Sequence, residues 1–268
     1  MIVTIDDALD PRLNAFRWRE RQLTTIAQRK SALNEGLFIA EGDLVVHRAL
    51  EAGCVPDVVL CDPKCATEFS NAVHIAGGTT LIASADIRRE VTGLGVPLDA
   101  IGVFKRPPLV SSSDLIAQST RLIVLDCVDN PSNVGSIART AAALGWDGLL
   151  LDSTSSDPLS RRALRVSMGT TFKLGFARFA STTEILMQLH QTGFTTIGLT
   201  PTHESREVSN LRSIQPEGKR ALVLGSERHG LSDASLEQCS KLANITMAEG
   251  VDSLNVASAS AIACFALL

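Results

Sequence analysis

Apolar residues in the second half of the chain alternate between short continuous runs and helical spacing. Residues 122–125 read Leu-Ile-Val-Leu, an unbroken apolar run that is typical of a strand covered on both faces. The pattern predicts strands over 122–125, 148–151, 174–179, 194–199, 221–225 and 242–246, and helices over 133–144, 160–168, 182–191, 232–239 and 253–267. Strands that alternate with helices predict a parallel sheet with helices on both faces.

The first half has a less regular α/β pattern and no visible catalytic constellation. We expect a basic helix over 12–33, a strand over 37–40, a helix over 43–52, a strand over 58–60, and strand-like pieces near 73–75, 80–82 and 100–104.

A break separates the two halves. Pro107, Pro108 and the serine run 111–113 are poor material for a helix or a strand and are typical of a linker. The sequence therefore predicts two α/β domains, a smaller N-terminal domain over 1–110 and a parallel-sheet domain over 111–268.

Length and composition fit a globular protein of 268 residues, of which 45% are hydrophobic and 20% charged. No apolar run approaches the roughly 18 residues that a membrane-spanning helix needs. The acidic N-terminus does not resemble a secretory signal, so we expect a cytoplasmic protein without a membrane partner. Cys61 and Cys65 form the one close cysteine pair and no second pair follows, so we expect free thiols and no metal site.

The net charge of −4 argues weakly against a nucleic-acid partner, but the charge is unevenly spread. Residues 11–34 hold six basic side chains against one acid, Glu20, and residues 158–183 hold five basic side chains and no acid. These two stretches favour a local phosphate-binding surface, although a basic helix face is commonly just solvated.

Several common sites are missing. Gly93-x-Gly95 lacks the third glycine of a dinucleotide fingerprint, so a nucleotide-dependent dehydrogenase is disfavoured. The sequence has no P-loop, and its five histidines have no ligand-like spacing.

The loop after the expected strand 122–125 carries polar turn chemistry. Pro131 ends the strand, Ser132 or Asn133 can cap the following helix, and Gly135 allows a close backbone approach. Arg139 follows among small residues, with room to reach a phosphate. An ordinary capped helix with a surface arginine is the alternative interpretation.

Two further strand-exit loops have similar features. Gly225 and Gly230 frame Glu227 after one strand, and Ser253 or Asn255 lies near the start of the last helix. In an open α/β sheet the ligand crevice lies at the carboxyl ends of the strands, where these loops would be. Taken singly, they could also be a glycine-rich turn and the start of a buried helix.

Together, these residues resemble a known family. The three motifs of the SpoU (TrmH) class of SPOUT methyltransferases are similar, in the same order, to Asn133-x-Gly135-x-x-x-Arg139, Gly225-x-Glu227-x-x-Gly230 and Ser253-Leu254-Asn255. The resemblance covers about 120–268. More loosely, Gly36–Gly42 resembles the start of that family's substrate-binding domain, which is similar to RNA-binding ribosomal proteins.

The resemblance implies a cofactor, S-adenosylmethionine, held in a C-terminal trefoil knot. General folding rules disfavour a knot, so only the resemblance supports it. It also implies that Gly225, Ile245 and Leu254 line the adenosine site, with Met247 and Thr200 as further candidates. Family members are homodimers with shared active sites, so Arg139 is expected to serve the pocket of the partner chain.

The implied reaction is attack of a ribose 2′-hydroxyl on the cofactor's methyl group. The implied catalytic residues are Arg139, Asn133, Glu227, Ser253 and Asn255. Because a guanidinium stays protonated up to a pKa above about 12, we favour Arg139 as a phosphate clamp over a general base. Ser253 and Asn255 would orient the ribose, and Glu227 would hold Arg139 or the loop.

The RNA is left open by the sequence. An N-terminal RNA-binding domain favours ribosomal RNA, with transfer RNA as the alternative. A catalytically silent RNA-binding protein of the same fold is the competing function. Arg228 and His229 fill positions that vary in the family, where they either tune substrate choice or have no role.

Overall fold

The computed structural model describes residues 2–30, 34–202, 205–215 and 217–268. The chain forms two compact units, each described by itself. The N-terminal unit consists of Met1–Leu109 and Leu159–Phe172, and the C-terminal unit of Val110–Pro158 and Lys173–Leu268. The division differs from the continuous domains expected from sequence, because a short segment from the middle of the chain joins the first unit.

The N-terminal unit has a five-stranded sheet in the order β1-β4-β3-β5-β2, in which only β5 runs opposite to the others. Its strands are β1 (Ile2–Ile5), β2 (Leu37–Glu41), β3 (Pro56–Cys61), β4 (Thr79–Ala83) and β5 (Ala100–Lys105). Its helices are α1 (Glu20–Leu23), α2 (Ile26–Lys30), α3 (Asp43–Glu51), α4 (Ala66–Ile75), α5 (Ala85–Thr92) and α8 (Arg161–Ser167), with a 3-10 helix over Pro11–Arg17.

Two expectations for this unit are wrong. The continuous helix over 12–33 is broken, because Trp18, Arg19 and Thr24 adopt extended backbone angles between short helical turns. Residues 31–33 of that expectation lie outside the described residues. The strand expected near 73–75 is the last turn of α4, where Val73 is a buried residue of the helix.

Helix α8 is attached to the N-terminal unit by ion pairs with Glu41 at the end of β2. The Glu41 side chain is 3% exposed, and its two oxygens lie 3.4 Å from Arg161 Nη1 and 2.9 Å from Arg165 Nη1. Burying a carboxylate is costly unless it is paired, so these arginines have a structural partner. This reduces the phosphate-binding surface expected over 158–183, because two of its five basic side chains are committed inside the unit.

The C-terminal unit has a seven-stranded sheet in the order β10-β12-β9-β11-β6-β7-β8, with every pair parallel, as the sequence predicted. Its strands are β6 (Arg121–Asp126), β7 (Gly148–Leu151), β8 (Gly175–Arg178), β9 (Thr195–Leu199), β10 (Val208–Asn210), β11 (Arg220–Gly225) and β12 (Lys241–Asn244). Its helices are α6 (Ser112–Gln118), α7 (Pro131–Ala143), α9 (Thr182–Gln191), α10 (Asp233–Gln238) and α11 (Val256–Ala266).

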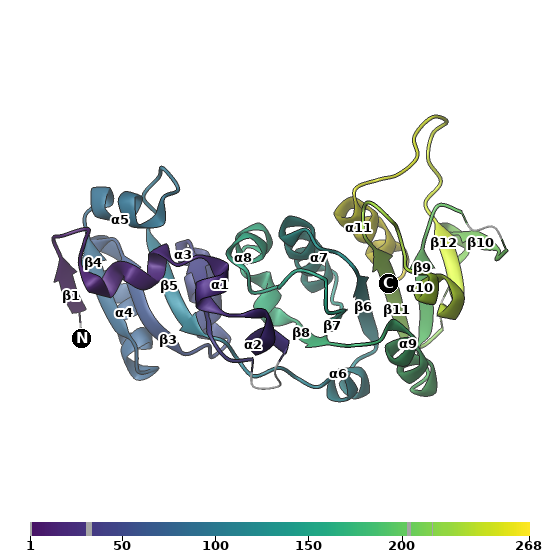
Figure 1. Cartoon of the computed structure of the whole chain (residues 1–268), viewed down its shortest axis with the longest axis horizontal. Helices are drawn as coiled ribbons and strands as arrows, with labels where there is room; N and C mark the ends of the chain where they lie inside the picture. Colours follow the sequence, from purple (N-terminus) through teal and green to yellow (C-terminus); the bar gives the residue numbers. More distant parts are fainter. Residues whose placement is uncertain (1, 31–33, 203–204, 216) are drawn as a thin grey trace. The chain divides into compact units, whose positions relative to one another are not determined.

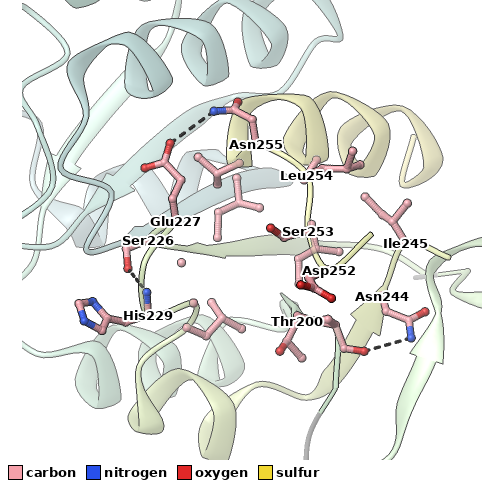
Figure 2. Close-up of a pocket in the computed structure, with 18 of the residues that line it drawn as sticks. Thr200, Ser226, Glu227, His229, Asn244, Ile245, Asp252, Ser253, Leu254 and Asn255 are labelled. Carbon is pink, nitrogen blue, oxygen red and sulfur yellow. Dashed lines mark hydrogen bonds between the residues drawn. The ribbon is translucent and has the colours of Figure 1, made fainter. Parts of the chain in front are cut away.

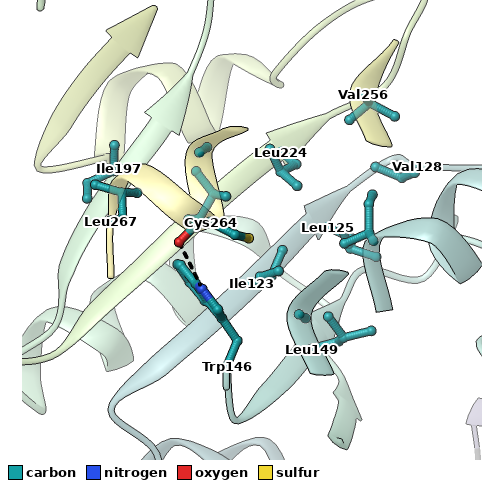
Figure 3. Close-up of a cluster of buried hydrophobic side chains, with 14 of the residues drawn as sticks. Ile123, Leu125, Val128, Trp146, Leu149, Ile197, Leu224, Val256, Cys264 and Leu267 are labelled. Carbon is teal, nitrogen blue, oxygen red and sulfur yellow. Dashed lines mark hydrogen bonds between the residues drawn. The ribbon is translucent and has the colours of Figure 1, made fainter. Parts of the chain in front are cut away.

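Helices cover both faces of this sheet (Figure 1). Alternate residues of β6 point to opposite faces: Ile123 packs with α7 and α11, whereas Leu122 packs with α6 and α9. In the first of these layers the Trp146 indole N–H donates to the carbonyl of Cys264 over 3.3 Å, within a buried cluster of aliphatic side chains (Figure 3). This packing fixes α7 and α11 side by side on the sheet.

The start of α7 differs from the expectation. The N-cap is Asn130, whose side chain accepts from the Ser132 N–H over 2.9 Å, whereas Ser132 or Asn133 was expected in that role. Pro131 occupies the first helical turn, where a missing N–H costs nothing. The earlier start frees the Asn133 side chain for another contact.

Candidate active site

A pocket of about 430 Å³ lies at the carboxyl edge of the parallel sheet, where the loops after β9, β11 and β12 meet (Figure 2). Its wall combines apolar side chains with a few polar groups, the usual make-up of a small-molecule site. The lining includes Leu199, Thr200, Pro201, Gly225, Ser226, Glu227, His229, Gly230, Ile245, Met247, Asp252, Ser253, Leu254 and Asn255.

The structure brings most of the sequence-predicted residues to this pocket. All five candidates for cofactor contact line it, namely Thr200, Gly225, Ile245, Met247 and Leu254. Of the five catalytic candidates, Glu227, Ser253 and Asn255 line it as well. Asn133 does not line the pocket but is hydrogen-bonded to Glu227 and Asn255, which do. Arg139 does not line the pocket.

The turn after β11 needs glycine at its first position. A Cβ atom on Gly225 would lie 2.2 Å from the carbonyl carbon and oxygen of Gly230. The turn is closed by two backbone hydrogen bonds, from Ser226 N–H to the Gly230 carbonyl over 3.0 Å and back over 2.9 Å. A side chain at Gly225 would therefore push this turn away from the sheet edge.

The three predicted motifs meet at the carboxylate of Glu227. The Asn133 side-chain amide donates to Glu227 Oε1, and the Asn255 amide donates to Asn133 Oδ1 over 3.2 Å and to Glu227 Oε1 over 3.4 Å. These contacts link α7, the turn after β11 and the start of α11. Glu227 was expected to hold Arg139 or the loop, and among the described residues its side-chain partners are these two amides.

Asn255 has a second structural role. Its Oδ1 accepts from the Ala257 N–H over 2.9 Å, so it is the N-cap of α11. Both ends of its amide are thus engaged within the protein. In contrast, the Ser253 hydroxyl has no hydrogen-bond partner among the described residues, and it borders the pocket. Ser253 is therefore better placed than Asn255 to contact a ligand.

Arg139 lies on another face of α7. It is six residues beyond Asn133, which corresponds to about 240° around a helix, and it is exposed whereas Asn133 is buried. Within the part of the chain that the structure describes, its guanidinium forms no ion pair or hydrogen bond. The side chain is therefore available to a group from outside this chain.

Sequence reasoning missed part of the pocket wall. The Thr200 N–H donates to the Ala243 carbonyl over 2.9 Å, and the Asn244 amide donates to the Pro201 carbonyl over 3.3 Å, which joins the ends of β9 and β12. Asp252 also lines the pocket. Their place in the sequence could have identified these residues, because Pro201 and Asn244 lie at the carboxyl ends of adjacent parallel strands.

Three titratable side chains line the pocket, the carboxylates of Glu227 and Asp252 and the imidazole of His229. This balance favours a ligand that carries positive charge. Among the residues that the structure describes, no group of three His, Cys, Asp or Glu side chains could hold a metal ion. No helix in the same described ranges is long and apolar enough to cross a membrane.

Comparison with known proteins agrees with this geometry. Residues 120–265 match the SpoU rRNA Methylase family. A tRNA/rRNA methyltransferase of Mycobacterium tuberculosis is 33% identical over 260 residues, 97% of this chain and 89% of the relative. A 23S rRNA (guanosine-2′-O-)-methyltransferase of Xylella fastidiosa is 29% identical over 173 residues, 65% of this chain and 68% of the relative.

Solved structures share the whole fold. The AdoMet-bound rRNA methyltransferase of Sinorhizobium meliloti superimposes with a TM-score of 0.83 at 24% identity, covering 99% of this chain and 97% of the other. An RNA 2′-O ribose methyltransferase superimposes with a TM-score of 0.74 at 24% identity over the same shares. With the matched family domain spanning more than half of its length, this chain belongs to the SpoU rRNA methylase family of RNA methyltransferases.

Proposed function

We propose that this chain transfers a methyl group from S-adenosylmethionine to a ribose 2′-hydroxyl of RNA, with ribosomal RNA favoured as substrate. The observation that carries the proposal is the convergence of Thr200, Gly225, Ile245, Met247 and Leu254 on one pocket from three separate loops. The AdoMet-bound rRNA methyltransferase with the same fold supports the choice of cofactor.

The pocket has features that suit this cofactor. Ile245, Met247 and Leu254 offer an apolar wall for a planar base, and the turn at Gly225 leaves backbone groups accessible beside it. The carboxylates of Glu227 and Asp252 suit a cofactor that carries an ammonium and a sulfonium group. When bound, S-adenosylmethionine supplies an electrophilic methyl group.

The residues of the chain contribute mainly by position. Ser253, with its free hydroxyl at the pocket, orients the ribose. Hydrogen bonds among Asn133, Glu227 and Asn255 hold the three segments that carry them together. Arg139 clamps the phosphate next to the reacting sugar and stabilises the developing alkoxide, since an arginine general base is disfavoured by its high pKa.

We propose that the active site is completed by a second copy of the chain. Ile262 and Phe265 on α11 are 44% and 70% exposed, so this helix presents a large apolar surface to solvent. Because α11 packs beside α7, a copy that covers these residues also comes close to the exposed Arg139. Each pocket would then use the partner's Arg139.

The knot, the cytoplasmic location and the RNA-binding role of the N-terminal unit stay predictions. The relatives carry both tRNA and rRNA in their names, so transfer RNA is the second candidate substrate. Total RNA incubated with the protein and methyl-labelled S-adenosylmethionine, followed by mapping of the methylated nucleotide, decides between them. Labelled cofactor that binds without transfer to any RNA would instead support the silent RNA-binding protein.

Arg139→Ala tests the proposed chemistry. We expect methyl transfer to fall by about a hundredfold or more, because a transition-state contact is lost. The affinity for S-adenosylhomocysteine should stay within a few fold, because the proposed partner of Arg139 is the RNA phosphate and not the cofactor. Near-normal turnover would refute the assignment.

Mixing two inactive variants tests the shared site. Arg139→Ala and Ser253→Ala proteins are each expected to be inactive. If Arg139 acts across the dimer, a heterodimer has one intact site, and an equal mixture recovers about a quarter of wild-type activity after subunit exchange. If Arg139 acts within its own chain, mixing recovers nothing.

A further inference from the structure

A buried carboxylate lies directly behind the pocket, at the carboxyl end of β6. Asp126 is 1% exposed and pairs with Gly225 in the parallel ladder between β6 and β11. It is therefore the immediate neighbour of the residue at which the turn over 226–231 begins. None of the three motifs that define the site assigns it a role.

Asp126 also holds the other end of that turn. Its Oδ2 accepts from the Ser232 N–H over 2.8 Å and from the Ser235 hydroxyl over 2.6 Å. Ser232 is the first residue after the turn and the N-cap of α10. A single residue thus fixes both ends of the segment that carries Glu227 and His229 to the pocket.

The partners of Asp126 are neutral donors. Among the described residues it forms no ion pair, and its strongest contacts are the two from Ser232 and Ser235. A buried carboxylate without a cation is expensive to maintain for stability alone, and an apolar residue would fill a strand position as well. The directional contacts to one loop indicate that the carboxylate serves to position it.

We propose that Asp126 is a positioning residue for the cofactor pocket, acting through the turn over 226–231. The expected effect on cofactor binding rests on the proposed function. Loss of the carboxylate releases the Ser232 N–H, so the turn shifts at its far end. Glu227 then leaves the amides of Asn133 and Asn255, and the wall around Gly225 opens.

A control carboxylate, Asp147, contacts the other end of β6. The Asp147 carboxylate accepts from the backbone N–H groups of Thr120 and Arg121 over 2.7 and 2.8 Å. These contacts lie at the amino edge of the sheet, away from the pocket lining. Asp147 is exposed, unlike Asp126, so Asp147→Asn controls for the loss of one carboxylate charge beside β6 without touching the turn.

The test compares Asp126→Asn with Asp147→Asn by calorimetric titration with S-adenosylhomocysteine and by hydrogen exchange. We expect Asp126→Asn to weaken binding by about tenfold or more, because a neutral amide oxygen accepts from Ser232 and Ser235 more weakly than a carboxylate does. Exchange over 226–232 should speed up, whereas Asp147→Asn should keep both measurements near wild type. Binding of Asp126→Asn within twofold of wild type, or an equal loss in Asp147→Asn, would overturn the inference.

If Asp126→Asn does not fold, Ser235→Ala tests the positioning role of Asp126 instead. It removes the 2.6 Å donor and leaves the strand intact, so binding should weaken by about threefold and exchange at 226–232 should rise. Unchanged binding and exchange would contradict the proposal. Wild-type protein that fails to bind the cofactor would defeat the proposed function, while the exchange measurements would still test the role of Asp126.

Discussion

The two units use acidic residues at the carboxyl ends of their strands in different ways. In the N-terminal unit, Glu41 at the end of β2 is paired with two arginines, and Asp62 after β3 is paired with the buried Arg88. β2 and β3 run in the same direction, so both carboxylates lie at one edge of the sheet. These two carboxylates are neutralised by cations of the same unit.

In the C-terminal unit, the corresponding edge keeps its negative charge. Asp126 and Glu227 accept hydrogen bonds only from neutral amide, hydroxyl, thiol and backbone donors among the described residues. An ion pair offsets the charge of a carboxylate, whereas neutral donors orient the carboxylate without offsetting it, and of these two carboxylates Glu227 lines the pocket. The two sheet edges thus differ in whether these acids are paired with cations.

Gly225→Ala should give the largest effect on the binding edge. The new methyl group would lie 2.2 Å from the Gly230 backbone, so the turn must move. We expect affinity for S-adenosylhomocysteine to fall by about a hundredfold, measured by calorimetry, because the strain falls on the pocket wall.

Gly193→Ala is the control for that variant. Gly193 has a positive φ of 84°, a Cβ atom added there would meet open space, and the residue lies outside the pocket lining. The substitution should cost about 1 kcal/mol of stability and leave affinity unchanged. Equal loss of affinity in both variants would contradict the claim that the close approach of Gly225 to Gly230 shapes the pocket.

Glu41→Ala should lower the stability of the protein and leave cofactor affinity unchanged, in contrast to Gly225→Ala. Removing one partner of a buried ion pair leaves Arg161 without its counter-charge, so we expect the free energy of unfolding to fall by about 3 kcal/mol. Cofactor affinity should persist, because Glu41 does not line the pocket. Asp86→Ala, which breaks an exposed pair with Arg89, should leave urea unfolding unchanged.

Asp152→Asn should give the smallest effect, visible as pH dependence. Burial of Asp152 raises its pKa, but hydrogen bonds from Ser155 and Thr154 outweigh burial, so the pKa is lowered overall. A lowered folded-state pKa means that its stabilisation is present above the unfolded value of about 3.9 and is lost as pH falls.

The measurement is urea unfolding of wild type and Asp152→Asn between neutral and acid pH. The variant should be less stable by about 1 kcal/mol at pH 7, and the difference should shrink as pH falls below about 4. A difference that stays constant down to acid pH would contradict the lowered pKa of Asp152.

The C-terminal unit was largely predictable from sequence because its signals are local. Continuous apolar runs such as 122–125 mark strands buried on both faces, and parallel strands bring their carboxyl ends to one edge. The turn at Gly225 was therefore expected at that edge, whereas its meeting with Ile245 and Leu254 in one site was implied by the family resemblance. The Glu227 network was not predictable, because its partners Asn133 and Asn255 lie 94 and 28 residues away.

The N-terminal unit was harder because its signals depend on distant contacts. The basic stretch 12–33 has helical composition, yet Trp18 and Thr24 adopt extended backbone. Helix α8 was found as a helix but not as part of this unit, since its partner Glu41 lies 120 residues earlier than Arg161. Propensity alone does not contain such information.

The attachment of Leu159–Phe172 to the N-terminal unit has a consequence for synthesis of the chain. Glu41 emerges from the ribosome long before Arg161 and Arg165, so the first unit is completed only by a helix that is translated after β6 and β7. A nascent chain stalled near residue 110 would therefore carry an acidic strand end without its counter-ions, a state in which solvent or a chaperone has to take their place.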